Sequence, residues 1–111
     1  MGGFPVTKEL VGNTPVDVRR SPGTITGGWA EVPGALDGYI VFYNKPAAEV
    51  SVGNTPPYYY QRCFGFSTAF LTRGAEEITF DNAISVATVV NLNLGGAAPP
   101  GTPANIVMII S

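Results

Sequence analysis

The clearest alternation of hydrophobic and polar residues lies between Ile84 and Leu94. Successive side chains of a β-strand point to opposite faces, so residues two positions apart share a face. The pattern predicts a strand with one face on a hydrophobic core and one polar face toward solvent. The first face carries Ile84, Val86, Thr88, Val90, Leu92 and Leu94, and the second carries Ser85, Ala87, Asn91 and Asn93, broken only by Val89.

Shorter patterns of the same kind recur along the chain, and none of them favours a helix. The 14 glycines and 10 prolines leave few uninterrupted windows, whereas a helix needs about 10 to 12 residues. We therefore predict an all-β single domain over residues 1–111, an antiparallel β-sandwich or a jelly-roll-like fold. Gly27 and Gly28 interrupt the third expected strand, which predicts a β-bulge there. The expected strands are 5–11, 15–20, 24–32, 38–44, 48–53, 57–73 (one or two strands), 76–80, 84–94 and 104–110.

Segment 57–73 is rich in aromatic residues. Phe64, Phe66 and Phe70 share one face of an extended chain, and we expect this face and Trp29 to lie in the core. The opposite face consists of small residues, which would let another backbone approach closely. Its members are Cys63, Gly65, Ser67 and Ala69.

Residues 82–111 carry no charged side chain, because all six basic and all eight acidic residues lie between Lys8 and Asp81. Within this region a Gly/Pro-rich connection, 95–103, precedes an apolar strand. An exposed apolar strand is an aggregation hazard, so either the domain's own core or another subunit must cover it. We expect the second arrangement, with 95–111 as a C-terminal assembly arm. The expected interface residues of this arm are Ile106, Val107, Met108, Ile109 and Ile110.

Arg19 and Arg20 are the only two adjacent basic residues. They are explained either by a solvated strand end or by an anchor against an acidic partner surface, since guanidinium groups form bidentate contacts with carboxylates. We include both in the predicted partner interface. Six basic residues and a sequence pI near 4.8 argue against binding to the phosphates of nucleic acid.

Residue types that support catalysis are scarce. Histidine is absent, which removes the usual general base at neutral pH and the commonest metal ligand. Cys63, the only cysteine, is better explained as a small buried residue than as a nucleophile. Glu76 and Glu77 are adjacent, so in a strand they point to opposite faces and cannot form an acid–base pair. We predict no enzyme activity, and no catalytic, cofactor-binding or metal-binding residues.

The same sequence offers little to suggest secretion or membrane insertion. No apolar run approaches the roughly 20 residues of a membrane-spanning helix, and the N-terminal residues lack a signal-peptide pattern. A single cysteine forms no internal disulfide, so the reduced cytoplasm suffices for folding. We therefore predict no membrane partner.

Residues 38–94 contain a more specific pattern. A Tyr39-x-x-x-Tyr43-Asn44-Lys45 strand precedes a Val52-Gly53-x-x-x-Pro57 turn, and the aromatic segment follows. This order resembles a recurring pattern in small structural proteins of tailed-phage virions. The resemblance implies a capsid decoration (cement) protein that stabilises the shell, or a neck or tail accessory protein of the same fold. It also implies synthesis in the host bacterial cytoplasm and a final location on the capsid surface of the virion. The implied partners are the major capsid protein or other virion proteins, in a homo-oligomer with a trimer favoured.

Aromatic content alone supports a second class of function. Tyr58, Tyr59 and Tyr60 alternate faces, so at least one ring is expected to point outward. Together with Trp29 these rings would form a platform on which sugar rings stack, as in a small carbohydrate-binding β-sandwich module. Aromatic residues in strands are more often core or interface residues, which favours the structural interpretation.

Overall fold

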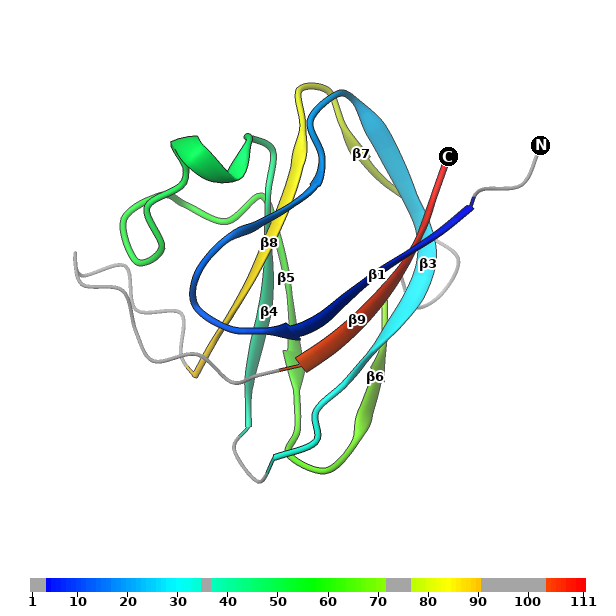
Figure 1. Ribbon diagram of the computed structural model, residues 1–111, viewed down its shortest axis with the longest axis vertical. Helices are drawn as coiled ribbons and strands as arrows, with labels where there is room; N and C mark the ends of the chain where they lie inside the picture. Colours follow the sequence, from blue (N-terminus) through cyan, green and yellow to red (C-terminus); the bar gives the residue numbers. More distant parts are fainter. Residues whose placement is uncertain (1–3, 35–36, 72–76, 91–103) are drawn as a thin grey trace.

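The computed structural model describes residues 4–34, 37–71, 77–90 and 104–111. Over these residues the protein is an all-β sandwich of two antiparallel sheets, which confirms the predicted fold class (Figure 1). A single 3₁₀ turn, η1 (Ala47–Glu49), is the only helical element in this part of the chain. The strands are β1 (Phe4–Val11), β2 (Val16–Arg19), β3 (Gly23–Glu31), β4 (Gly38–Tyr43), β5 (Tyr59–Cys63), β6 (Thr68–Phe70), β7 (Ile78–Phe80), β8 (Ile84–Val89) and β9 (Ala104–Ile110).

The two sheets are built mainly from strands that are distant in the sequence. The first sheet has the order β1-β9-β3-β6, and β7 also pairs with β3, whereas the second has the order β2-β8-β4-β5. The long strand β3 accommodates two short neighbours on one edge, because β7 pairs with residues 23–25 and β6 pairs with residues 29–31. Only β4–β5 and β6–β7 are consecutive strands of the same sheet. Each of the remaining six connections crosses from one sheet to the other.

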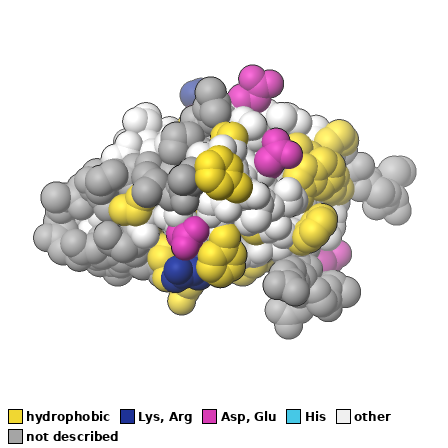
Figure 2. All heavy atoms as spheres, turned by 90° about the horizontal axis from the view of Figure 1, so that it is seen from below, with side chains coloured by type: hydrophobic (Ala, Val, Ile, Leu, Met, Phe, Trp, Pro, Cys, Tyr) yellow, Lys and Arg dark blue, Asp and Glu magenta, His cyan; other side chains and the backbone are white. Residues whose placement is uncertain are grey.

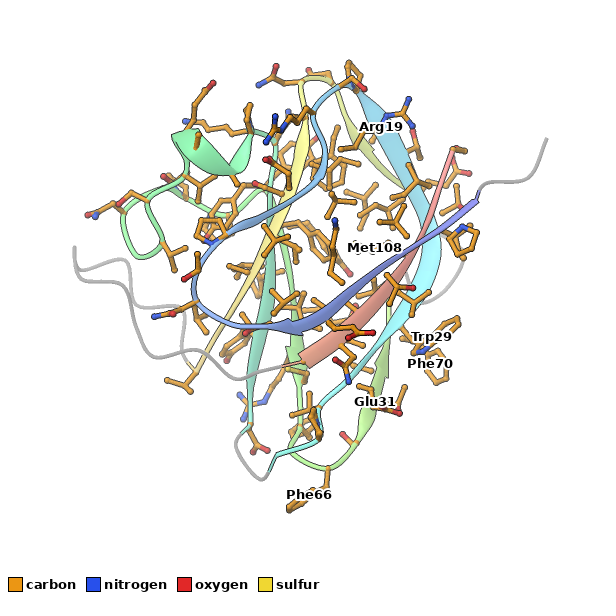
Figure 3. The ribbon with its side chains drawn as sticks, viewed as in Figure 1. Arg19, Trp29, Glu31, Phe66, Phe70 and Met108 are labelled. Atoms are coloured by element: carbon orange, nitrogen blue, oxygen red, sulfur yellow. The ribbon has the colours of Figure 1, made fainter. Side chains whose placement is uncertain are left out.

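The main core fills the space between the sheets. Strand β9 shows how it is built, because its residues are alternately buried and half-buried along its whole length. Met108 of this strand lies at the centre of the molecule (Figure 3) and is fully buried. The largest side chains that are fully shielded from solvent are Phe42, Phe80, Ile25, Ile40, Ile84, Ile106, Met108 and Ile110.

A second hydrophobic cluster covers the outer face of the second sheet. Val52 packs there against Val41 and Val89, with Val50 half-buried beside them. As a result every residue of β8 is buried, and the prediction of a solvent-facing side for this strand was wrong. The covering segment is the region predicted as strand 48–53. It forms η1 and a turn instead, with the main-chain N–H groups of residues 54 and 55 donating to the Ser51 carbonyl. Residues 91–94 of the predicted strand 84–94 lie outside the described residues.

The predicted bulge in β3 is confirmed and decides which side chains face the core. The pairing of β3 with β9 shifts register between Ile25 and Gly27, which inserts one residue. Ile25 and Ala30 are both buried, five positions apart, although an unbroken strand would put them on opposite faces. Gly28 has a φ of 139°, and a Cβ at this position would lie 2.1 Å from the Val107 carbonyl oxygen. Glycine is therefore required for the close approach of β3 to β9.

The last strand does not leave its own domain. β9 lies between β1 and β3, with paired neighbours on both sides, so the prediction of an assembly arm was wrong for residues 104–111. Residues 95–103 of the predicted arm lie outside the described residues. The physical reason is that the apolar strand finds its cover in the domain's own core, where alternate residues are fully buried. These residues are Ala104, Ile106, Met108 and Ile110.

Candidate functional site

The phenylalanines of segment 64–70 and Trp29 are exposed, contrary to the prediction that they form the core. The exposed fractions are 42% for Trp29, 53% for Phe64, 75% for Phe66 and 61% for Phe70. The small residues of the same segment take the inner positions instead, since Cys63 is fully buried and Ala69 packs against the core. Figure 2 shows hydrophobic side chains standing out on this end of the molecule with acidic side chains between them.

Two separate causes turn these rings outward. The bulge in β3 reverses the alternation, so Trp29 points away from the core while Ala30 points into it. Phe70 lies directly opposite Trp29 in the β3–β6 pair and therefore projects from the same face of the sheet. Phe64 and Phe66 lie in the turn between β5 and β6, where the strand alternation does not apply. Gly65 and Ser67 within this run are turn-forming residues and are the signal from which the break could have been predicted.

The exposed residues of β3, β6 and the adjoining turn lie at one end of the first sheet, and we call them together the β3–β6 face. It consists of Trp29, Glu31, Pro33, Phe66, Thr68 and Phe70. Trp29 and Phe70 lie side by side near its upper part, and Phe66 projects from its lower tip (Figure 3). Between them Glu31 is opposite Thr68 in the strand register, so a polar pair separates the two aromatic parts.

The β5–β6 turn holds Phe66 in a backbone conformation that suits glycine better. Phe66 has a φ of 54°, the only positive φ of a residue other than glycine among the described residues. A bulky residue in this region is strained by about 1 to 3 kcal/mol. Hydrogen bonds hold the turn in place: the Phe66 N–H donates to the Gly34 carbonyl at 2.8 Å, and the Ser67 hydroxyl donates to the Phe64 carbonyl at 2.8 Å. The Gly65 N–H donates to the Asp37 carboxylate, also at 2.8 Å.

A shallow pocket of about 270 Å³ opens at the tip of the β3–β6 face. The carboxylate of Glu31 and the hydroxyls of Ser67 and Thr68 give this pocket hydrogen-bonding groups beside the Phe66 ring. Its lining residues are Glu31, Val32, Pro33, Phe66, Ser67 and Thr68.

The tyrosine run does not join Trp29 in a single platform. Trp29 belongs to the first sheet, whereas Tyr59 and Tyr60 belong to β5 of the second. The Tyr59 ring faces inward, 5.9 Å from that of Phe42, and the Tyr58 ring lies 4.9 Å from that of Phe80. The composite sugar platform predicted from the sequence is therefore not assembled, and the partner of Trp29 is Phe70.

The outer side of β5 carries its own aromatic group around one cation. The Arg62 guanidinium lies 5.4 Å from the centre of the Tyr39 ring and 5.2 Å from that of the Phe64 ring. It also donates a hydrogen bond to the Tyr39 hydroxyl at 3.0 Å. The Tyr60 ring packs edge-on against Tyr39 at 6.0 Å. These contacts fix Phe64 beside β5, away from the β3–β6 face.

The two adjacent arginines have different environments. Arg20 is largely exposed and forms a 3.0 Å ion pair with Asp17, as expected of a solvated strand end. Asp17 also accepts a 2.7 Å hydrogen bond from the Ala47 N–H, and this bond, with a smaller contribution from Arg20, holds the pKa of the carboxyl below its ordinary value. The Nε atom of Arg19 donates to the Ser21 hydroxyl at 3.1 Å.

The predicted interface residues of β9 divide between the two sides of the sheet. Ile106, Met108 and Ile110 are buried in the core, so they are not available to a partner in this fold. Val107 and Ile109 point to the outer side and are half-buried, with Val107 next to Trp29 in the strand register. Val107 and Ile109 thus lie at one edge of the exposed apolar surface, whose large rings on β3 and β6 were not predicted to be exposed.

Groups able to support catalysis are few among the described residues. Burial raises the pKa of the Cys63 thiol, which disfavours the reactive thiolate. Within the described residues no cluster of three or more potential ligand side chains could hold a metal ion. No helix of the described part is both long enough and apolar enough to cross a membrane.

No family model, curated protein or solved structure matches this chain.

Proposed function

We propose that the chain is a structural protein of a tailed-phage virion, a capsid decoration protein that docks through its β3–β6 face. The observation that carries this proposal is Phe66, which is 75% exposed and has a φ of 54°. Both its exposure and its backbone conformation are unfavourable in the isolated chain. A phenylalanine at such a position is explained if its ring is the anchor that fills a pocket of a partner.

The surroundings of Phe66 suit a protein interface. Trp29 and Phe70 add two large exposed rings on the same face, and aromatic residues are enriched among the residues that dominate binding energies. Glu31 and Thr68 supply polar groups that would set the orientation of the partner. Exposed apolar surface of this kind on a small domain marks an interaction site.

A decoration protein acts by linkage. A subunit that binds the assembled shell and not its free components stabilises the shell, because the added contacts must break before the shell opens. A rigid sandwich with one exposed aromatic face meets this requirement. The proposed partner is the major capsid protein, and the decorating unit is a homo-oligomer, with a trimer as the expectation carried from the resemblance.

Immunogold labelling of phage particles from infected cells that produce this chain tests the proposal and separates capsid from neck or tail positions. Label over the whole shell supports a decoration protein, and label at one vertex or along the tail supports the accessory alternative. Particles without label contradict both. Adding purified Phe66→Ala protein to undecorated particles should reduce occupancy at least about tenfold, whereas Tyr60→Ala, equally aromatic but outside the face, should bind like the original.

The outer face of the first sheet also favours a second candidate, a carbohydrate-binding module. Trp29 and Phe70 are neighbours across the strand pair, and Glu31 and Thr68 occupy the next outward positions. Rings for stacking beside hydrogen-bonding groups suit sugar rings, which present both C–H and O–H groups. A glycan-array screen of the purified protein tests this function. Binding that is lost in Trp29→Ala and retained in Tyr60→Ala would support it, and absence of binding to any glycan would exclude it.

A further inference from the structure

The second strand contains a bulge that changes the direction of one charged side chain. In the β2–β8 pair Asp17 is opposite Ser85 and Arg19 is opposite Ile84, so Val18 is an extra residue. Ile84 points into the main core. Directly opposite residues project from the same face, so the bulge places Arg19 on the core-facing side beside Val18, which also packs against the core. The result is a guanidinium at the open edge of the sandwich.

A pocket of about 340 Å³ lies at this edge, between β1 and β9 of the first sheet and β2 of the second. Its volume lies within the range of small-molecule sites, which begins at about 300 Å³. The half-buried Val6 and Val18 form apolar walls, and the lining also includes Ile110, which has no exposed surface. Arg19 and Ser21 are the polar residues of its lining. Arg19 and Phe66 lie at opposite ends of the long axis (Figure 3), so the pocket is separate from the β3–β6 face.

The position of the Arg19 side chain is set by its neighbours. Its Nε atom donates to the Ser21 hydroxyl, and its stem crosses Gly23, where an added Cβ would lie 3.1 Å from the Arg19 Cδ atom. No carboxylate of the described residues lies within ion-pair distance of Arg19, in contrast to Arg20, which pairs with Asp17. Arg19 therefore lines the pocket without an ionic partner from this part of the chain.

We propose that this edge pocket binds a small amphiphilic carboxylate. The carboxylate accepts hydrogen bonds from the Arg19 guanidinium, whose planar fork matches its two oxygens. The short hydrocarbon chain lies against the half-buried side chains of Val6 and Val18 and is removed from water there. A single cation and apolar walls favour a monoanion with a hydrocarbon tail over a polyphosphate, which requires several cationic or N–H donors.

Titration with sodium octanoate, followed by two-dimensional ¹H–¹⁵N NMR, tests the proposal. The expected shifts are saturable and centre on the amides of Val6, Val18, Arg19 and Ile110. Acetate lacks the tail and 1-octanol lacks the charge, so each should bind at least about tenfold more weakly than octanoate. Equal affinity for octanol and octanoate would show that the guanidinium makes no contribution and would overturn the proposal.

The adjacent arginines supply a matched pair of variants. Arg19→Gln should weaken octanoate binding by about tenfold or more, whereas Arg20→Gln should leave it unchanged while removing the same formal charge. Octanoate shifts that centre on Trp29 and Phe70 would indicate adsorption to the aromatic face and contradict the pocket. Absence of saturable shifts would also overturn the proposal and leave the bulge with Arg19 as a device that protects the β2 edge from pairing with other strands.

Discussion

Trp29 and Phe70 lie directly opposite each other on β3 and β6, and both rings face solvent. The next pair along the same strands, Ala30 and Ala69, faces the core. The usual distribution, with large apolar groups inside and small or polar groups outside, is thus reversed where β6 meets β3. Such a reversal exposes apolar surface with no benefit to the isolated domain, which is why we associate this face with a partner.

Replacing Phe66 should separate stability from binding. Phe66→Gly should raise the free energy of unfolding by up to about 1 kcal/mol, because glycine adopts positive φ without the strain that a side chain suffers. Phe66→Ala keeps the strained backbone and should change stability by less than about 0.5 kcal/mol. Urea denaturation followed by circular dichroism measures both, and both variants should lose the capsid binding that we propose.

The matched control for Phe66 is Phe80, which is fully buried. Phe80→Ala should lower the free energy of unfolding by about 3 to 5 kcal/mol, because it removes core contacts and leaves a cavity. If Phe66→Ala were as destabilising as Phe80→Ala, the Phe66 ring would have to be part of the core, contrary to its 75% exposure.

Gly28→Ala should be among the most damaging single substitutions in β3. Its Cβ would meet the Val107 carbonyl oxygen at 2.1 Å, and the φ of 139° is itself unfavourable for any residue with a side chain. We expect the free energy of unfolding, measured by thermal or urea denaturation, to fall by more than about 2 kcal/mol. Gly12→Ala is the control, since a Cβ there meets nothing within 4 Å and the stability should change little. Similar stabilities for the two variants would contradict the close packing of β3 on β9.

The C-terminal strand should be essential for folding. Deleting residues 104–111 removes the strand that joins β1 to β3 and should abolish the β-sheet signal in far-ultraviolet circular dichroism. Point variants give a finer test: Met108→Ala should cost about 2 to 5 kcal/mol, and Val107→Ala, one position along and half-buried, should cost clearly less. A truncated chain that remained folded and monomeric would restore the assembly-arm hypothesis.

Asp17 should make stability depend on pH in the acid range. The hydrogen bond from the Ala47 N–H, together with Arg20, lowers the pKa of the folded-state carboxyl below the ordinary value of 3.8. The unfolded chain therefore binds a proton more readily than the folded one. The contribution of Asp17 is fully present above pH 3.8 and is lost as the pH falls through the lower, folded-state pKa. Asp17→Asn should lose this part of the pH dependence, measured as urea midpoints between neutral and acid pH, and an unchanged acid profile would contradict the assignment.

Local sequence was sufficient to predict the class of fold and most of its strands. Proline and glycine spacing excluded long helices, and alternation located eight of the nine expected segments. The exception, 48–53, forms η1 and a turn that pack Val50 and Val52 over the second sheet. The bulge at Gly27 was also predicted, because consecutive glycines are a local signal that needs no knowledge of the partner strand.

What only the tertiary structure decided is which face of each strand became the core and which strands became neighbours. Alternation divides β6 into an aromatic side and a small side, but the buried side depends on a bulge in β3, a strand it meets only in space. Likewise the apolar residues of β9 required a cover, and the sequence left open whether that cover was the chain itself or another subunit. Pairing with β1, at the far end of the chain, made the domain itself the cover. A strand that is hydrogen-bonded on both edges and buried on one face would lose these contacts if it left its sheet. The side chain of Arg19 faces the sandwich edge for the same kind of reason, since its direction follows from the register between β2 and β8.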